Sequence, residues 1–170
     1  MGIETIEFSG RSYPKFQSSG YASRFIIPIA REVCKGVGFD IGSGQREWSL
    51  PGSIVADPMI VPECSGGYSA TNLPIVNGGI DYIFSSHCLE HLSNWISIMD
   101  YWITKIRPGG VLFLYLPDSS QGYWAFGNRK HVNIFTPEII KGYMVNRGLK
   151  NIFVSGVDLN NSFAAMCEVP

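Results

Sequence analysis

The segment GVGFDIGSGQREWSLPGSIVADP, residues 36–58, constrains the fold more than any other part of the sequence. Val37 and Phe39 suit a buried strand that ends at Ile41. The turn Gly42-Ser43-Gly44 lets the backbone turn sharply with no Cβ in the way at its two glycines. A second short apolar run, SIVA, ends at Asp57. In an open parallel sheet, ligands bind outside the carboxyl ends of the strands. We therefore expect Asp40, the glycine turn and Asp57 to line one crevice that binds a nucleoside.

The residues missing from this turn indicate which nucleoside it can bind. A dinucleotide fingerprint needs a third glycine where the helix packs close to the strand, and Arg46 occupies that position. NAD is therefore disfavoured. S-adenosylmethionine carries no phosphate, so two glycines near its methionine end and an acid for its ribose hydroxyls can be sufficient. The alternative is an ordinary turn with solvated acids, because a single GxG is a weak motif.

Length and composition indicate a single domain over residues 1–170, large enough for a hydrophobic core. The formal net charge of −1 gives no electrostatic reason to expect nucleic acid or an anionic membrane as a partner. No apolar run approaches the roughly 18 residues of a membrane span, and the N-terminus does not resemble a signal peptide. The four cysteines show no CxxC spacing, so we expect free thiols and a cytoplasmic protein.

Hydrophobic periodicity predicts helices and strands after an N-terminal arm, residues 1–19, that shows no period. The predicted helix 21–33 contains Pro28, which either kinks it or marks a late start. After the glycine turn, residues 45–50 leave room for one helical turn. Further helices are predicted over 95–106 and 136–148, and further strands over 80–84, 111–116, 151–157 and 163–169. The last two strands should form an antiparallel hairpin.

Six motifs occur in one order: FDIGSG, VADP, ATNLP, IDYIFSSHCLEHL, IRPGGVLFLYLPD and HVNIFTPE. In this order and spacing, the chain resembles a small class I S-adenosylmethionine-dependent methyltransferase of the broad type 11 kind, over roughly residues 36–148. Each motif alone is weak, whereas the ordered set is specific. The resemblance implies an α/β, Rossmann-like fold with helices on both faces. It implies a seven-stranded, mostly parallel sheet in the order 3-2-1-4-5-7-6, with an antiparallel last strand.

The resemblance also implies a binding site for the cofactor S-adenosyl-L-methionine. Its residues would be Asp40, Gly42, Ser43, Gly44, Asp57, Asn72, Leu73, Ser86 and His87. Asp40 and the glycines match the motif beneath the methionine portion, and Asp57 matches the acid that holds the ribose hydroxyls. Ser69 stands where such enzymes often carry an acid for the adenine amine, so backbone groups of residues 71–73 would replace that contact. The segment after Gly44 has room for only a shortened helix, and in this respect the chain resembles a subgroup of these enzymes that often acts on sugars or other small metabolites.

His87 and His91 lie four residues apart with Glu90 between them, a spacing that on a helix places two imidazoles on one face, as a metal site requires. The HExxH arrangement is absent and no third ligand can be assigned, so we expect no metal. We expect His87 to edge the cofactor pocket, and Glu90 and His91 to make polar contacts at the start of the following helix. Cofactor binding should then be independent of metal.

An irregular mix of aromatic and polar residues, 119–135, is the predicted active-site loop. Methyl transfer is an in-line displacement at the sulfonium methyl, so alignment and exclusion of water should supply most of the rate. His131 is the candidate general base or acceptor-orienting group, because an unperturbed imidazole titrates near pH ~6.5. Asp118 is the rival base, and the alternative for His131 is to brace the loop. Tyr123 and Trp124 either contact a substrate or the sulfonium, or pack as a lid.

These observations support three hypotheses for function. The first is methyl transfer to an oxygen or nitrogen of a small-molecule or glycan-like acceptor. The second is a catalytically silent S-adenosylmethionine-binding domain that serves as a partner or regulatory subunit. The third, a nicotinamide enzyme, is disfavoured by Arg46. Asp118 and His131 favour the first hypothesis over the second, because an inactive domain has no need to keep these residues beside an open crevice.

Overall fold

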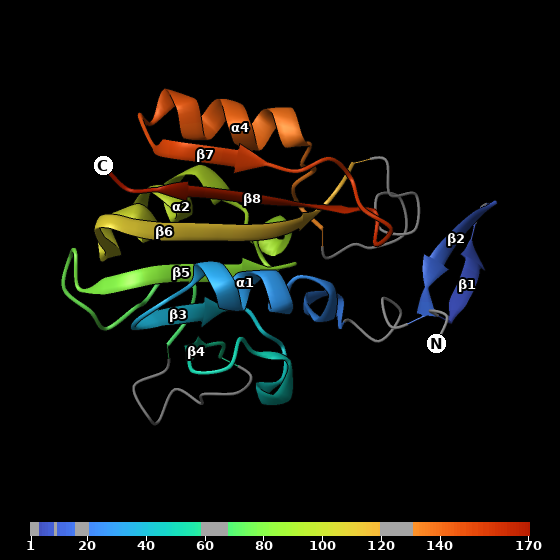
Figure 1. The fold of residues 1–170 in the computed structure, drawn as a ribbon, viewed down its shortest axis with the longest axis horizontal. Helices are drawn as coiled ribbons and strands as arrows, with labels where there is room; N and C mark the ends of the chain where they lie inside the picture. Colours follow the sequence, from blue (N-terminus) through green and yellow to red (C-terminus); the bar gives the residue numbers. More distant parts are fainter. Residues whose placement is uncertain (1–3, 9, 16–20, 59–67, 120–130) are drawn as a thin grey trace.

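The computed structural model describes residues 4–8, 10–15, 21–58, 68–119 and 131–170 (Figure 1). Its main sheet consists of β3 (Gly38–Ile41), β4 (Ile54–Ala56), β5 (Ile80–Ser86), β6 (Ile106–Pro117), β7 (Lys150–Val154) and β8 (Ser162–Glu168). The strand order is β4-β3-β5-β6-β8-β7. The first four strands in this order pair in parallel, while β8 runs antiparallel to both β6 and β7. The expected α/β, Rossmann-like fold is therefore confirmed, including the antiparallel last strand and the closing hairpin.

The number of strands differs from the expectation. Within the described residues the sheet has six strands rather than seven, and it ends at β4, where the expected order has one more strand. After β4 the description resumes at residue 68 with tight turns. Ser69 and Asn72 exchange backbone hydrogen bonds of 3.0 and 3.1 Å, which closes a local turn instead of a ladder with β4. Pro74 and the Gly78-Gly79 turn, which follow, do not suit a sheet strand either.

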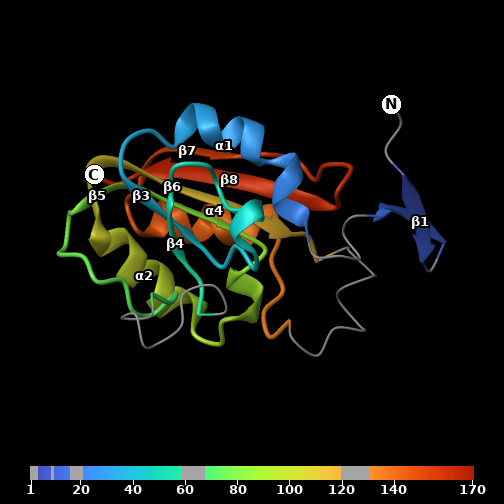
Figure 2. The same ribbon diagram turned by 90° about the horizontal axis from the view of Figure 1, so that it is seen from below.

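Helices cover both faces of the sheet, as expected, and Figure 2 shows α1 (Ile27–Val33) and α2 (Trp95–Lys105) on opposite sides. The helix α4 (Pro137–Asn146) lies on the same face as α2. Successive side chains of β5 point to opposite faces, so Tyr82 and Phe84 pack toward α1, while Ile83 packs toward α2. None of the helices in the described ranges is long and apolar enough to cross a membrane.

The helix boundaries follow from local sequence signals. A 3-10 turn, η2 (Ala22–Phe25), precedes α1, and Pro28 lies in the first turn of α1, where its missing N–H costs no hydrogen bond. Pro28 thus marks a late start rather than a kink. After the glycine turn the chain forms only the single 3-10 turn η3 (Arg46–Trp48), as predicted. The Thr136 side chain caps α4 by accepting a hydrogen bond from the Ile139 backbone N–H at 3.3 Å.

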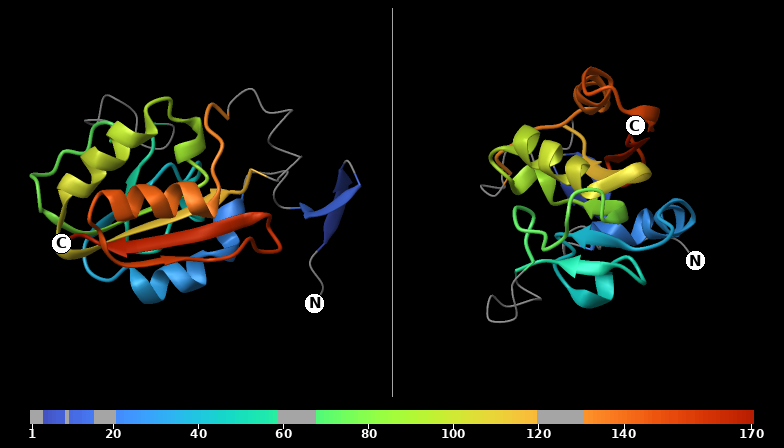
Figure 3. Two further views of the ribbon diagram at one scale, coloured as in Figure 1. Left: turned by 90° about the horizontal axis from the view of Figure 1, so that it is seen from above. Right: turned by 90° about the vertical axis from the view of Figure 1, so that its left-hand side faces the viewer.

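The N-terminal arm contains regular structure that the sequence pattern did not indicate. The strands β1 (Thr5–Phe8) and β2 (Arg11–Pro14) pair as an antiparallel hairpin. Gly10, with φ of 74°, lies in the turn between them, where the left-handed backbone suits glycine. Figure 3 shows this hairpin standing apart from the main sheet.

Candidate active site

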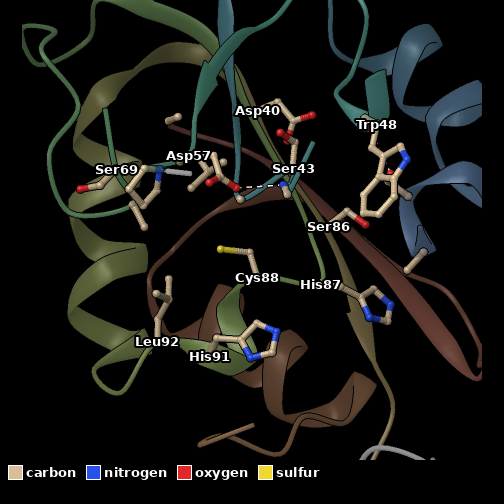
Figure 4. A pocket seen from close by; sticks show the side chains of 18 of the residues that line it. Asp40, Ser43, Trp48, Asp57, Ser69, Ser86, His87, Cys88, His91 and Leu92 are labelled. Atoms are coloured by element: carbon tan, nitrogen blue, oxygen red, sulfur yellow. Dashed lines mark hydrogen bonds between the residues drawn. The ribbon is translucent and has the colours of Figure 1, made fainter. Parts of the chain in front are cut away.

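A cavity of about 850 Å³ opens at the carboxyl ends of β3, β4 and β5 (Figure 4). The predicted site residues that line it are Asp40, Gly42, Ser43, Gly44, Asp57, Ser86 and His87. They come from three neighbouring parallel strands and the turns after them. The crevice expected at this edge of the sheet is therefore present, and its volume suits a nucleoside-sized ligand.

The glycine turn is held against β4 by two hydrogen bonds. The backbone N–H of Gly42 donates to the Ala56 carbonyl at 3.1 Å, and that of Gly44 donates to Asp57 Oδ2 at 2.8 Å. Both glycines have left-handed backbones, with φ of 78° and 73°. A Cβ on Gly42 would also overlap the side chain of Cys88. Glycine at position 42 is thus required by its backbone conformation and by its close neighbour.

The two acids of the turn have different surroundings. Asp57 is 7% exposed and shares the cavity wall with the glycine turn. Asp40 is 1% exposed, and its Oδ2 accepts a hydrogen bond from the Leu50 backbone N–H at 2.6 Å. Burial raises the pKa of Asp40 to about 7, although the Leu50 hydrogen bond opposes this shift. The Asp40 carboxylate therefore holds the backbone at Leu50, which follows η3, whereas the Asp57 side chain forms part of the cavity wall.

The cavity wall at which a contact with adenine was expected differs from that expectation. Ser69 and Thr71 line it, whereas Asn72 and Leu73 do not. Leu73 is a core residue at 3% exposure, and the Tyr101 hydroxyl contacts both of its backbone groups, accepting from the N–H at 2.8 Å and lying 3.3 Å from the carbonyl. Its backbone groups are therefore engaged away from the cavity. The segment 69–71 is the candidate for a contact with adenine.

Sequence reasoning missed one wall of the cavity. The Trp48 ring, on η3, stacks on Tyr21 with ring centroids 5.1 Å apart and an interplanar angle of 12°, and Trp48 lines the cavity. The shortness of the segment after the glycine turn was the available signal, because a single helical turn keeps its side chains close to that turn. Cys88 and Leu92 also line the cavity and had no predicted role.

The three histidines of the chain gather around Glu90, which lies in the 3-10 turn η5 (Leu89–His91) rather than at the start of α2. His87 Nδ1, His91 Nε2 and His131 Nε2 lie 3.6, 3.8 and 3.9 Å from Glu90 Oε1. His87 and His91 line the cavity. Burial, together with the neighbouring His131 and His91, lowers the pKa of His87 to about 3.

The two candidate bases are in different places. The His131 ring packs edge-to-face on His91 with centroids 4.7 Å apart, and the next residue, Val132, lines the cavity. Asp118 lines a separate hollow of about 620 Å³, together with Glu138 and Lys141. Its backbone N–H donates to the Asn161 carbonyl at 3.0 Å, which holds it on the side of β8. Asp118 is therefore not beside the main cavity, and the predicted aromatic residues of the loop, Tyr123 and Trp124, fall outside the described residues.

Comparison with known proteins gives a family match over most of the chain. A family model described as "Methyltransferase domain" matches residues 19–154. A search of curated proteins finds no match.

Solved structures share the fold at low sequence identity. An S-adenosylmethionine-dependent methyltransferase from Thermotoga maritima, described as a possible histamine N-methyltransferase, is 14% identical with a TM-score of 0.69, covering 91% of this chain and 92% of its own. The 1,6-didemethyltoxoflavin-N1-methyltransferase of Burkholderia thailandensis, solved with S-adenosylhomocysteine, is 13% identical with a TM-score of 0.65, covering 98% and 94%. The [4+2]-cyclase SpnF is 13% identical with a TM-score of 0.62, covering 100% and 87%.

Proposed function

The chain belongs to the methyltransferase domain family, whose cofactor is S-adenosyl-L-methionine, and we propose that it methylates an oxygen or nitrogen of a small-molecule or glycan-like acceptor. The observation that carries this proposal is the cavity at the carboxyl ends of β3 to β5, with the glycine turn and Asp57 on one wall. We further propose that the chain acts as one domain in the cytoplasm.

The cofactor would lie along the wall formed by the glycine turn. In this arrangement Asp57 accepts hydrogen bonds from the two ribose hydroxyls, and the turn 42–44 lies against the methionine portion. Ser69 and Thr71 would border the adenine, and Ser86 and His87 would border the sulfonium side, because both pairs line the same cavity. Trp48 closes the cavity on the side of the glycine turn.

Methyl transfer needs an acceptor atom in line with the sulfonium methyl. His91, Leu92 and Val132 form part of the remaining cavity wall. His131 is the candidate proton acceptor for a hydroxyl acceptor, because it packs on His91. Burial, together with the neighbouring His91, lowers the pKa of His131 to about 4. The imidazole is therefore neutral at pH 7, although a pKa this low makes it a weak base.

The catalytically silent alternative makes a different prediction at the same cavity. A fold of this kind also occurs in a protein named as a [4+2]-cyclase, so the fold alone does not require methyl transfer. The test is a calorimetric titration of the full chain with S-adenosylmethionine, followed by a screen of hydroxyl- and amine-bearing acceptors for formation of S-adenosylhomocysteine. Binding with turnover supports the methyltransferase proposal, whereas binding without turnover over a broad acceptor set favours the silent domain. Absence of binding would contradict both.

A further inference from the structure

Glu90 is a carboxylate buried without a hydrogen-bond partner for either side-chain oxygen among the described residues. It is 0% exposed. A buried acid in such surroundings is costly unless a cation or a donor compensates it. The backbone keeps it in place nonetheless, because the N–H groups of Val132 and Asn133 both donate to the Glu90 carbonyl, at 2.9 and 3.1 Å.

The groups that face this carboxylate are nitrogen ligands from two parts of the chain. Potential ligand atoms of Glu90, His91 and His131 all lie within 4.8 Å of one another. His91 follows Glu90 directly, whereas His131 comes from the loop before α4. The third ligand that the sequence could not assign is therefore supplied by tertiary structure, which removes the reason for expecting no metal here.

His87 places a further nitrogen lone pair beside the Glu90 carboxylate, and its hydrogen bond to Ser162 indicates which ring nitrogen carries that lone pair. The Ser162 hydroxyl donates to the Asn160 carbonyl at 3.1 Å, so its oxygen accepts from His87 Nε2–H at 2.9 Å. The other ring nitrogen, Nδ1, then carries a lone pair that faces Glu90 Oε1 at 3.6 Å. A bound cation or a proton on the Glu90 carboxyl would compensate the repulsion between these two lone pairs.

We propose that Glu90, His91 and His131 bind one divalent transition-metal ion of the zinc type. Two imidazoles and one carboxylate form a ligand set that zinc uses with one position left open. Bonds of about 2.0–2.1 Å in tetrahedral geometry place ligand atoms about 3.4 Å apart. The nitrogen-to-oxygen distances of 3.8 and 3.9 Å would need to contract only slightly to meet that spacing. Imidazole ligands favour zinc or cobalt over magnesium or calcium, which prefer oxygen.

The ion would lie at the acceptor side of the cavity. His91 lines the cavity, and Figure 4 shows it across the cavity from Asp57. The open position could therefore hold an acceptor oxygen, a consequence that rests on the proposed function, whereas metal binding itself does not. In the metal-loaded protein the ion occupies the lone pair of His131, so the proton-accepting role of His131 would belong to the metal-free protein alone.

The experiment is a titration of the chelator-stripped full chain, without cofactor or acceptor, using Zn²⁺ followed by calorimetry and Co²⁺ followed by visible absorption. We expect one ion per chain and a cobalt spectrum typical of four or five ligands. His91→Ala and His131→Ala should each weaken zinc binding by at least roughly 100-fold, since even outer-shell partners of metal ligands contribute 10- to 100-fold. Circular dichroism before titration identifies any variant that fails to fold.

Two control variants separate this site from its neighbours. Cys88→Ser removes a thiol that lines the cavity and should leave zinc affinity unchanged. Asp57→Ala should lose cofactor affinity while it keeps zinc affinity. The proposal is overturned if the wild-type chain binds no stoichiometric ion, which needs no variant to fold. It is equally overturned if the His91→Ala/His131→Ala double variant retains the ion, or if Cys88→Ser loses it. A failure here leaves S-adenosylmethionine binding intact, so it is distinguishable from a failure of the proposed function.

Discussion

Replacing Asp57 should weaken cofactor binding without unfolding the domain. Asp57 is 7% exposed, so hydrogen bonds between its carboxylate and the ribose hydroxyls would be shielded from water. A hydrogen bond to a charged group contributes about 1.5–3 kcal/mol, and losing that amount raises Kd by roughly 10- to 150-fold. Asp57→Ala also removes the acceptor of the Gly44 N–H at 2.8 Å, so its effect should lie toward the upper end of this range.

Two further variants separate the charge from the local structure. Asp57→Asn keeps an oxygen for the Gly44 N–H and removes only the charge, so its loss of affinity should lie toward the lower end of the range. Asp81 is a matched control, because it also accepts a backbone N–H, from Val37 at 2.7 Å, but lies at the opposite end of β5. Calorimetry with S-adenosylmethionine should show unchanged affinity for Asp81→Asn. Equal affinities for the wild type and Asp57→Ala would refute the assignment of the ribose.

Four other outcomes are expected. Chelator treatment should leave S-adenosylmethionine affinity unchanged in calorimetry, because the histidine cluster lies across the cavity from Asp57; a loss restored by zinc would contradict this. His131→Ala should bind cofactor normally but turn over at least ~100-fold more slowly once an acceptor is found, and near-normal turnover would exclude it from the mechanism. Gly42→Ala should lower the melting temperature markedly, since φ is 78° and the added Cβ overlaps Cys88; an unchanged value would contradict the geometry. In the native protein the pKa of Asp40 is raised to about 7, so Asp40 keeps a proton that the unfolded chain releases above about pH 4. The contribution of Asp40 to the free energy of unfolding therefore falls as the pH rises from about 4 to 7. Asp40→Asn should flatten this decline in denaturant titrations.

Much of the fold is encoded in short local signals. Most strands of the main sheet contain a short continuous apolar segment, such as Ile54–Ala56 in β4 and residues 111–116 in β6. The late start of α1 follows from the fixed φ of Pro28. The hairpin β1–β2 was not predicted, because four-residue strands give too few alternations to establish a period. The expected seventh strand, which the described part of the chain does not contain, was also not a local signal. That strand was expected only because the family fold contains it. In this chain Ser69 and Asn72 instead form a turn closed by local backbone hydrogen bonds.

The cofactor side of the cavity could be predicted because it is nearly continuous in sequence. Asp40 and the glycine turn are adjacent, and Asp57 comes next to them through the parallel register of β3 with β4. Leu73 lies in the core rather than at the cavity wall, and its backbone groups contact Tyr101, on a helix that begins more than twenty residues later. A sequence motif cannot show which backbone groups a distant hydroxyl will occupy.

The sequence alone could not predict the position of His131, because that position depends on hydrogen bonds made by Asn133. The Asn133 side-chain amide donates to the carbonyls of Leu89, at 3.2 Å, and Leu92, at 2.6 Å. The Leu92 carbonyl follows the end of η5, and the Leu89 carbonyl also accepts from the Leu92 backbone N–H at 3.2 Å. An amide with two donors can satisfy both at once. This contact fixes the register of the loop two residues after His131, and the same register places the His131 ring against His91 and Glu90. The burial of Glu90, the gathering of the histidines and the wall of the cavity at Val132 therefore depend on the same contact between the loop and η5.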